Sequence, residues 1–159
     1  MVSKIDGFTE KVLVADFGPD EKTAIAGFSD GSLIRLDLET GEIIRHYQGH
    51  ESAIWALDVS PDARFVLSGD DDGKVILWDL ATGEELFRLR GHTKAVQGVS
   101  FSPDGKTAFS AGRDGELIQW RIADLPFGNL VEWVKANRYV RDLTCGERDQ
   151  YEVEPLCED

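Results

Sequence analysis

Short runs in which apolar and polar residues alternate occur along most of the chain. Within residues 49–79, the Ser-Pro-Asp of residues 60–62 and the Asp-Gly of residues 72–73 separate these runs. The runs are 53–59, 64–68 and 74–79. Alternation with a period of two is typical of strands, and proline, aspartate and glycine between the runs favour tight turns. The stretch therefore predicts a meander of three antiparallel strands.

The same landmarks return 42 residues away in both directions. Gly49-His50 recurs as Gly91-His92, Pro61-Asp62 as Pro19-Asp20 and Pro103-Asp104, Asp72-Gly73 as Asp30-Gly31 and Asp114-Gly115, and Trp78 as Leu36 and Trp120. A fixed period without insertions indicates one supersecondary unit used three times. A fourth short strand is expected at 41–47 and at 83–89, each after a Thr-Gly turn. The predicted units span about 5–47, 48–89 and 90–122.

The period changes after residue 122, where the alternation with a period of two ends. Apolar residues then recur at the spacing of three and four that is typical of one helix face. They are Leu130, Trp133, Ala136, Val140 and Leu143. Thr144 and Glu147 match a capping box, which predicts a second short helix to about Tyr151. The expected fold is therefore an all-β region, residues 1–122, followed by a short α-helical tail, residues 123–159.

In this order and at this period, the Gly-His, Ser-Pro-Asp, Asp-Gly and Trp-Asp landmarks resemble the WD-repeat β-propeller family. The resemblance covers roughly residues 5–122 and implies a partial propeller of three blades, each a four-stranded antiparallel meander. The first unit has Phe8, Ala26 and Leu36 where the pattern has His, Ser and Trp, which is typical of a degenerate or edge blade. The segment 133–157 resembles the tails of bacterial multi-repeat WD proteins.

The charge of the chain narrows the range of partners. Seventeen basic and thirty acidic residues give a net charge of −13, and no cluster of Lys and Arg interrupts this balance. Phosphate groups would be repelled, so neither nucleic acid nor an anionic membrane is expected to bind. There is no run of 18 apolar residues, and residues 1–6 lack the apolar run of a signal peptide. A cytoplasmic location is expected.

The residues that commonly bind metals show no metal-binding spacing. The histidines are His46, His50 and His92. Cys145 and Cys157 lie outside the repeats and are expected to be free thiols, and together with the histidines they do not match a zinc motif. The acidic stretch 70–73 does not continue as an EF-hand, because Ala81 stands where the closing Glu is required. Neither a metal nor a cofactor is expected.

Each well-formed unit contains a His, a Ser, an Asp and a Trp at equivalent positions. They are His50, Ser68, Asp72 and Trp78 in the second unit, and His92, Ser110, Asp114 and Trp120 in the third. The family resemblance implies that these residues form a structural hydrogen-bond network within each blade. Ser, His and Asp together also suggest a hydrolase that uses Ser68 or Ser110. A catalytic triad has no reason to recur every 42 residues, so the structural interpretation is preferred.

The resemblance also indicates where a partner would bind. In this family the residues that flank the centre of each first strand, and the residue before the turn Asp, line the binding face. In this chain they are Ala53, Trp55 and Asp71 in the second unit, Ala95, Gln97 and Arg113 in the third, and Lys11, Leu13 and Ser29 in the first. Trp55 stands on a strand made otherwise of smaller residues, and an aromatic residue there can anchor an interface. Packing of Trp55 between blades is the alternative.

These observations predict a non-enzymatic scaffold or adaptor for protein-protein interaction. The alternative is a sensor or regulatory fragment of a larger bacterial signalling or effector enzyme system. Propellers typically have four to eight blades, so three blades are expected to leave two open faces. We therefore expect the chain to complete its propeller as a homo-oligomer, with a homodimer preferred, or with a partner chain.

Overall fold

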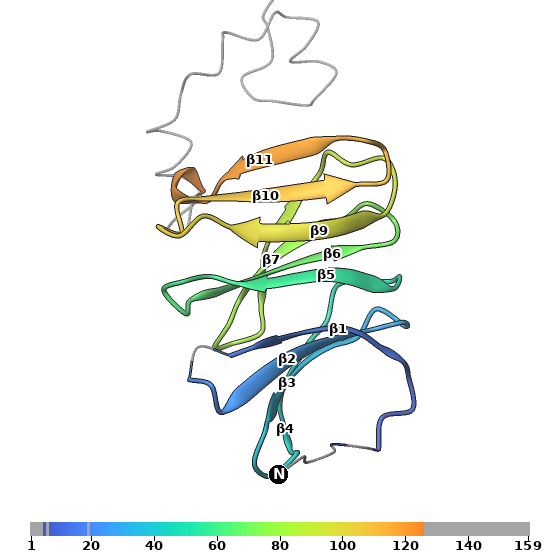
Figure 1. Ribbon diagram of the computed structural model, residues 1–159, viewed down its shortest axis with the longest axis vertical. Coiled ribbons are helices and arrows are strands. Elements are labelled where there is room, and N and C mark those ends of the chain that lie inside the picture. Colours follow the sequence, from blue (N-terminus) through green and yellow to red (C-terminus); the bar gives the residue numbers. More distant parts are fainter. Residues whose placement is uncertain (1–4, 6, 19, 126–159) are drawn as a thin grey trace, which may run out of the picture. The chain divides into compact units, whose positions relative to one another are not determined.

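The computed structural model describes residue 5, residues 7–18 and residues 20–125. These residues form three antiparallel sheets, in each of which strands that follow one another in the sequence pair side by side (Figure 1). The first sheet contains β1 (Val12–Phe17), β2 (Thr23–Phe28), β3 (Leu33–Asp37) and β4 (Ile43–Tyr47); the second contains β5 (Ile54–Val59), β6 (Phe65–Asp70), β7 (Val75–Asp79) and β8 (Glu85–Leu89); the third contains β9 (Val96–Phe101), β10 (Thr107–Gly112) and β11 (Leu117–Arg121). A 3-10 turn, η1 (Ile122–Asp124), follows β11.

The Asp-Gly pairs form the turns between the second and third strands of the sheets. Gly31, Gly73 and Gly115 have φ angles of +87°, +83° and +84°, a conformation that glycine adopts without steric cost. Each glycine N–H donates to the carbonyl three residues earlier, at 3.1 to 3.3 Å. A Cβ atom on Gly73 would lie 2.8 Å from the carbonyl oxygen of His92, whereas one on Gly115 would meet nothing within 4 Å. The recurring Asp-Gly pair therefore sets the tight turns that the alternation predicts.

The second sheet is buried on both faces because it packs between the other two. Alternate residues of its strands point to opposite sides, so Val66 and Ile76 face the first sheet while Leu67 and Leu77 face the third. The cluster toward the first sheet contains Ile25, Leu33, Tyr47, Ile54, Val66, Ile76, Trp78 and Leu80. The cluster toward the third contains Ala56, Phe65, Leu67, Val75, Leu77, Val96, Phe101, Ala108 and Ile122. The burial of every residue of β6 follows from this placement.

Polar contacts also link the sheets. The Tyr47 hydroxyl at the end of β4 donates to the carbonyl oxygen of Leu80 at 2.9 Å. Burial raises the pKa of Tyr47 to about 12, so the hydroxyl keeps its proton at physiological pH. The backbone N–H of Phe101 in β9 donates to Oδ2 of Asp58 in β5 at 2.6 Å. Neighbouring sheets are thus joined by directed hydrogen bonds as well as by apolar packing.

The face of the first sheet that lies away from the second sheet is partly covered by the chain's own N-terminal residues. Ala26, Phe28, Ile34 and Leu36 are each no more than 4% exposed, and Ile5 and Phe8 pack against them. The rings of Phe8 and Phe28 meet edge to face, with centroids 5.2 Å apart. The cluster covers part of this face only, since Val12, Phe17, Ile43 and Ile44 of the first sheet remain 45% to 67% exposed. The sequence prediction of two open faces stays a prediction.

The far face of the third sheet also exposes apolar residues. Phe109 and Leu117 are 38% and 69% exposed, whereas their counterparts 42 residues earlier, Leu67 and Val75, are completely buried. In the described part of the chain no fourth strand pairs with β11, unlike the first and second sheets, where β4 and β8 complete the order. Among the described residues, the third sheet therefore has three strands and an exposed apolar face.

The predicted all-β architecture of three antiparallel meanders is confirmed. One compact unit ends at Leu125, and the predicted division at residue 122 stays a prediction. The helices predicted between residues 130 and 151, together with Cys145 and Cys157, lie outside the described residues. No helix within the described ranges has the length and apolar character needed to cross a membrane.

Candidate interaction site

A buried hydrogen-bond network surrounds His50, in the loop that leads into β5. The His50 ring places Nδ1 2.8 Å from Oδ2 of Asp70 and Nε2 2.7 Å from Oγ of Ser68. The indole N–H of Trp78 donates to the same Ser68 hydroxyl at 2.8 Å. The side chains of His50 and Asp70 are inaccessible to solvent. Because these buried groups pair with one another, the network holds the loop firmly against β6 and β7.

The third sheet repeats this network around His92. The Nδ1 atom of His92 lies 3.0 and 3.1 Å from the two carboxylate oxygens of Asp114, and Nε2 lies 2.8 Å from Oγ of Ser110. Trp120 donates its indole N–H to Ser110 at 2.8 Å. Burial alone would raise the pKa of Asp114, but donors that include the backbone N–H of Thr93 at 2.8 Å lower it to about 2. Asp114 is therefore an anion at neutral pH.

The two networks take their carboxylates from different positions, and the prediction that placed Asp72 beside His50 is wrong. The Asp72 carboxylate is 57% exposed and lies 3.7 Å from the Lys74 ammonium. Asp70 takes its place because its other oxygen also accepts the backbone N–H groups of Asp72 at 3.1 Å and Lys74 at 2.8 Å. The residue equivalent to Asp70 in the third sheet is Gly112, which has no carboxylate. Asp114 holds that turn instead.

Apolar residues occupy the corresponding positions of the first sheet. Phe8, Ala26, Phe28 and Leu36 stand 42 residues before His50, Ser68, Asp70 and Trp78. All four belong to the apolar cluster on the outer face of this sheet. The contact between the rings of Phe8 and Phe28 thus replaces the hydrogen bond between His50 and Asp70. Sequence reasoning found three of these substitutions and missed Phe28, because it compared Asp72 rather than Asp70.

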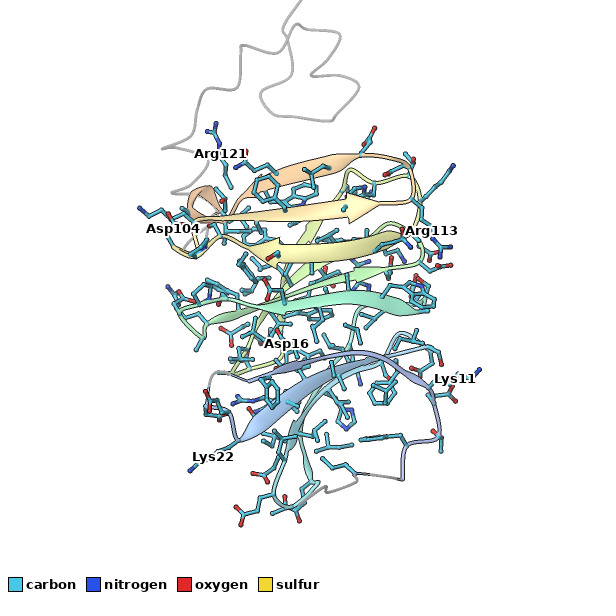
Figure 2. All side chains as sticks on the ribbon, in the orientation of Figure 1. Lys11, Asp16, Lys22, Asp104, Arg113 and Arg121 are labelled. Carbon is cyan, nitrogen blue, oxygen red and sulfur yellow. The ribbon has the colours of Figure 1, made fainter. Side chains whose placement is uncertain are left out.

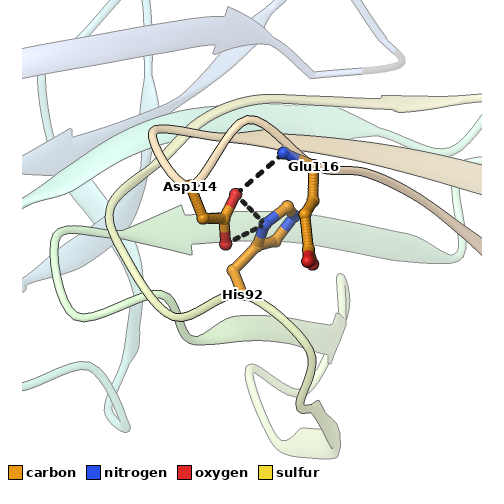
Figure 3. Close-up of side chains that lie close together, drawn as sticks. All are labelled: His92, Asp114 and Glu116. Atoms are coloured by element: carbon orange, nitrogen blue, oxygen red, sulfur yellow. Dashed lines mark hydrogen bonds and ion pairs between the residues drawn. The ribbon is translucent and has the colours of Figure 1, made fainter.

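His92, Asp114 and Glu116 form the group of possible metal ligands among the described residues, with their donor atoms within 4.8 Å of one another (Figure 3). Both ring nitrogens of His92 are already engaged, one by Asp114 and the other by Ser110. The backbone N–H of Glu116 donates to Asp114 at 3.1 Å, as expected for a capped turn. This arrangement explains the proximity of the three residues as part of the structural network.

The two serines that suggested a hydrolase are buried inside these networks. Ser68 and Ser110 are 0% and 1% exposed. Each hydroxyl lies between a histidine ring and an indole N–H and is hydrogen-bonded to both. A nucleophile must reach a substrate carbonyl, and neither hydroxyl faces solvent in this arrangement. The geometry favours the structural interpretation of Ser68 and Ser110.

The first strand of each sheet carries a β-bulge at a residue predicted to line the binding face. In β5, Ile54 pairs with Asp70 and Ala56 with Gly69, which leaves Trp55 as the extra residue. The same shift of register leaves Leu13 extra in β1 and Gln97 extra in β9. A bulge re-aims the side chain of the extra residue and is common beside functional sites. The bulges therefore determine where the side chains of Leu13, Trp55 and Gln97 point, and the sequence pattern did not predict these bulges.

Hydrogen bonds bring the predicted residues of each sheet together in pairs. The backbone N–H of Asp71 donates to the carbonyl of Ala53 at 2.9 Å, and that of Arg113 donates to Ala95 at 2.8 Å. The equivalent bond in the first sheet joins Ser29 and Lys11 at 3.0 Å. Figure 2 shows Lys11 and Arg113 at the same end of the strands. The residue before each turn therefore lies beside the start of the first strand.

Trp55 and Asp71 form a direct side-chain pair at this end of the second sheet. The indole N–H of Trp55 donates to Oδ1 of Asp71 at 3.0 Å, and Trp55 remains 42% exposed. This exposure does not match the alternative in which Trp55 is buried between neighbouring sheets. The hydrogen bond instead fixes the orientation of an aromatic ring at the surface.

The other candidates differ in exposure. Asp71, Gln97, Arg113 and Lys11 are exposed, whereas Ala95 is only 5% exposed. Ala53, Leu13 and Ser29 are half-buried. We define the rim site as Trp55, Asp71, Gln97 and Arg113, the four exposed candidates from the second and third sheets. Their formation of one contiguous surface stays a prediction.

Sequence reasoning missed two exposed residues, Phe109 and Leu117. Both were assigned to strands without regard to which face they occupy. The repeat contained the information, because their counterparts Leu67 and Val75 face the following sheet, whereas within the described residues no further sheet follows the third. Comparing equivalent positions would have placed both residues on an outer face.

Comparisons with known proteins identify the fold and the family. The family described as WD domain, G-beta repeat matches residues 41–79 and 83–121. Two solved structures, described as U3-55K and as the WD40 repeats of RRP9, are each 22% identical to this chain with a TM-score of 0.72. Each alignment covers 76% of this chain but only 39% and 38% of those two chains. No curated protein matches the sequence.

A computationally designed protein, Ika4, is more similar in sequence. Its crystal structure aligns with 31% identity and a TM-score of 0.66, covering 74% of this chain and 69% of Ika4. The three antiparallel meanders, the buried His-Ser-Trp networks and these similarities define a repeat protein with propeller-type blades. The chain belongs to the WD-repeat β-propeller family, and its described residues form a partial propeller of three blades.

Proposed function

We propose that this chain is a non-enzymatic WD-repeat scaffold or adaptor that binds a protein partner through the rim site. The observation that carries the proposal is Trp55, which lies on a bulge, donates to Asp71 at 3.0 Å and is 42% exposed. An aromatic side chain already held in one orientation loses little conformational entropy on binding. Exposed Gln97 and Arg113 add groups that can form hydrogen bonds with the partner.

The absence of enzymatic activity belongs to the same proposal. It is supported by the burial of Ser68 and Ser110 and by the engagement of both ring nitrogens of His50 and of His92. These groups stabilise the blades that display the rim site. The hydrogen bonds of these serine and histidine side chains stabilise the fold, and we assign no reaction to them.

The class of partner is proposed from the charge of the chain. With a net charge of −13, the chain would repel nucleic acid and anionic membranes, so we propose a protein partner. A cytoplasmic location is proposed as well. We further propose that the propeller is completed by association, in a homodimer or with a partner chain. Exposed Phe109 and Leu117 on the third blade support association at that end.

The decisive experiment compares two exposed aromatic residues on the first strands of different blades. Trp55→Ala removes the anchor of the rim site, while Phe17→Ala removes a side chain that is 67% exposed on β1 and outside that site. The wild-type chain captures its partner from cells, and the dissociation constant is then measured for each variant. We expect Trp55→Ala to weaken binding about 30-fold, as the loss of an interface hot spot does, and Phe17→Ala to change it little.

A further variant separates orientation from contact. Asp71→Asn keeps an oxygen that can accept the indole N–H, whereas Asp71→Ala does not. If the hydrogen bond matters by orienting Trp55, binding survives in Asp71→Asn and falls in Asp71→Ala. Equal binding by wild type and Trp55→Ala, with both proteins folded, would show that the rim site is not the interface.

A further inference from the structure

Five aspartates of this chain directly precede a glycine, and the backbone of such a pair can rearrange chemically. Four of the pairs have both residues in the described part of the chain, namely 30–31, 72–73, 104–105 and 114–115. The backbone nitrogen of the glycine can attack the aspartate side chain, because glycine has no side chain that hinders the approach. Whether a pair reacts then depends on how firmly its aspartate side chain is held, and the four differ in this respect.

Short hydrogen bonds hold the side chains of Asp30 and Asp104. Oδ1 of Asp30 accepts the Ser32 hydroxyl at 2.6 Å, and Oδ1 of Asp104 accepts the Ser102 hydroxyl at 2.6 Å. These hydrogen bonds lower the pKa of both carboxyl groups. Only the neutral acid readily loses its hydroxyl as water, so a carboxylate stabilised in this way is a poor target for a nitrogen nucleophile.

The side chain of Asp114 is held by several groups at once. Its two carboxylate oxygens lie 3.1 and 3.0 Å from Nδ1 of His92 (Figure 3). They also accept the backbone N–H groups of Thr93 at 2.8 Å and of Glu116 at 3.1 Å. Reaction with the backbone nitrogen of Gly115 would first require these contacts to break.

The side chain of Asp72 is held much less firmly. It is 57% exposed, and among the described residues its carboxylate has the Lys74 ammonium as its partner, at 3.7 Å. The cause is Asp70, which accepts the backbone N–H groups of Asp72 and Lys74 and so caps the turn. In the other two blades the aspartate of the Asp-Gly pair caps the turn itself. The Asp72 side chain can therefore rotate toward the backbone nitrogen of Gly73.

We propose that Asp72-Gly73 is a site of spontaneous isomerisation, at which Asp72 becomes isoaspartate. The Gly73 nitrogen forms a bond to Cγ of Asp72, and the proton of the nitrogen and the hydroxyl of the carboxyl group leave together as water. A water molecule then breaks the bond between this nitrogen and the α-carbonyl carbon of Asp72, so that the main chain continues through Cβ and Cγ. The two steps together conserve composition and need solvent water alone.

Isomerisation would place an additional main-chain carbon in a crowded turn. The backbone of Gly73 lies so near the next blade that a Cβ atom on it would be 2.8 Å from the carbonyl oxygen of His92. The preceding residue is Asp71, whose backbone N–H donates to Ala53 and whose carboxylate accepts the indole N–H of Trp55. The modified chain should therefore melt at a lower temperature. Any effect on a partner rests on the proposed function of the rim site, whereas the isomerisation does not.

Peptide mapping of the full chain tests the site, because trypsin separates the four pairs. They fall in the peptides 23–35, 65–74, 95–106 and 114–121. The chain is incubated at physiological temperature and pH, and isoaspartate is identified by electron-transfer mass spectrometry and by methylation with an isoaspartyl methyltransferase. We expect it to form at least about tenfold faster in 65–74 than in each other peptide, a ratio of about 1.4 kcal/mol that hydrogen bonds to a charged group can supply. Comparable rates in all four peptides would overturn the proposal.

Incubation of the chain in concentrated urea separates the effect of the fold from that of the local sequence. Unfolding removes the hydrogen bonds that protect the other three aspartates, so the four peptides should then form isoaspartate at similar rates. If 65–74 kept its lead in urea, the local sequence would be the cause and the structural argument would be wrong.

Two variants locate the reaction and test its cause. Asp72→Glu keeps the carboxylate but would require a larger ring that forms slowly, so isoaspartate in 65–74 should disappear and the aged variant should keep its melting temperature. Isoaspartate that persists in this variant would arise at Asp70 or Asp71 and would overturn the assignment. Ser32→Ala removes the hydroxyl that holds Asp30 and should raise the rate in 23–35 without changing that in 65–74. An unchanged rate in 23–35 would show that such hydrogen bonds do not protect the pair.

Discussion

At the scale of single residues, the choice between Asp70 and Asp72 decides how the second blade is held together. Asp70 pairs with His50 and caps the following turn, while Asp72 points toward solvent near Lys74. Removing one partner of a buried hydrogen-bonded pair leaves the other unpaired, which costs more than losing a surface contact. The two aspartates, two positions apart, should therefore respond very differently to substitution.

We expect Asp70→Ala to lower the free energy of unfolding by about 1–3 kcal/mol, because it leaves the His50 ring and two backbone N–H groups without an acceptor. His50→Ala should cost a similar amount. Asp72→Ala is the matched control and should change the free energy by less than about 0.5 kcal/mol. Urea denaturation measures all three, and an equal loss for Asp70→Ala and Asp72→Ala would contradict the observed network.

The pKa of Asp114 predicts part of the acid sensitivity. Its pKa in the folded chain is about 2, below the ordinary value of 3.8, so the stabilisation is present above about pH 4 and is lost as pH falls toward 2. The stability advantage of wild type over Asp114→Asn should therefore shrink between pH 5 and pH 2. Denaturant titrations at each pH measure it.

Asp58 supplies a comparison of opposite sign. Burial raises the pKa of Asp58 despite the hydrogen bond from Phe101, so its ionised form is disfavoured in the folded chain. Relative to Asp58→Asn, wild type should gain stability as pH falls through this raised pKa. If the stability difference from wild type changed with pH in the same direction for Asp114→Asn and for Asp58→Asn, the structure would be wrong about the surroundings of Asp114 and Asp58.

The repeat predicted most residues of the blade network, but it did not predict which aspartate takes part in it. The repeat pattern identified His50, Ser68 and Trp78, because the same residue types recur 42 residues later. Three consecutive aspartates precede Gly73, and the pattern cannot tell which carboxylate turns inward. That outcome depends on the local backbone donors, which are known only once the turn is built.

At the scale of elements, strands and turns were predicted well, while the bulges were not. The alternation of β5 continues through residues 53–59 in the sequence, although Trp55 has no partner of its own on β6. A bulge follows from the pairing of two strands, so the pattern of one strand does not reveal it. The family resemblance indicated Trp55 as a binding candidate, but the exposure of its side chain became apparent only in the folded sheet.

The Asp-Gly turns allow a test of how neighbouring blades fit together. Gly73→Ala and Gly115→Ala both place a side chain at positive φ, which should cost roughly 1–2 kcal/mol at each site. At Gly73 the added Cβ would also meet the backbone of His92 in the next blade at 2.8 Å, whereas at Gly115 the space is open. We expect an additional loss of about 1–3 kcal/mol for Gly73→Ala in chemical denaturation. Equal losses would mean that the two blades are further apart.

At the scale of the whole molecule, the two ends of the three-blade stack are unlike. Ile5 and Phe8 cover part of the outer face of the first blade, while the third blade exposes Phe109 and Leu117. Head-to-tail closure would join two unlike faces, of which the first is partly covered by Ile5 and Phe8. For the proposed homodimer we prefer pairing through two third blades, because Phe109 and Leu117 are exposed there and a two-fold interface uses the same surface on both copies.

Light scattering at micromolar concentration tests this arrangement. We expect wild type to be dimeric and Phe109→Lys to be monomeric, because the added charges would meet at the shared interface. Ile43→Lys is the control, since Ile43 is 45% exposed on the outer strand of the first blade, away from that face. If light scattering shows that the wild type is a monomer, and it unfolds cooperatively, the homodimer proposal is wrong.

The apolar cluster that replaces the polar network in the first blade makes the three repeats non-interchangeable. In the first blade Phe8 and Phe28 pack edge to face at the positions where, in the second blade, His50 and Asp70 form a hydrogen bond. At the end of the three-blade stack, Ile5 and Phe8 cover the apolar cluster of the first blade. A permuted gene that began with the second repeat would therefore place a hydrogen-bonded blade at the terminus and an apolar blade inside. The order of the repeats is itself part of the information that the chain encodes.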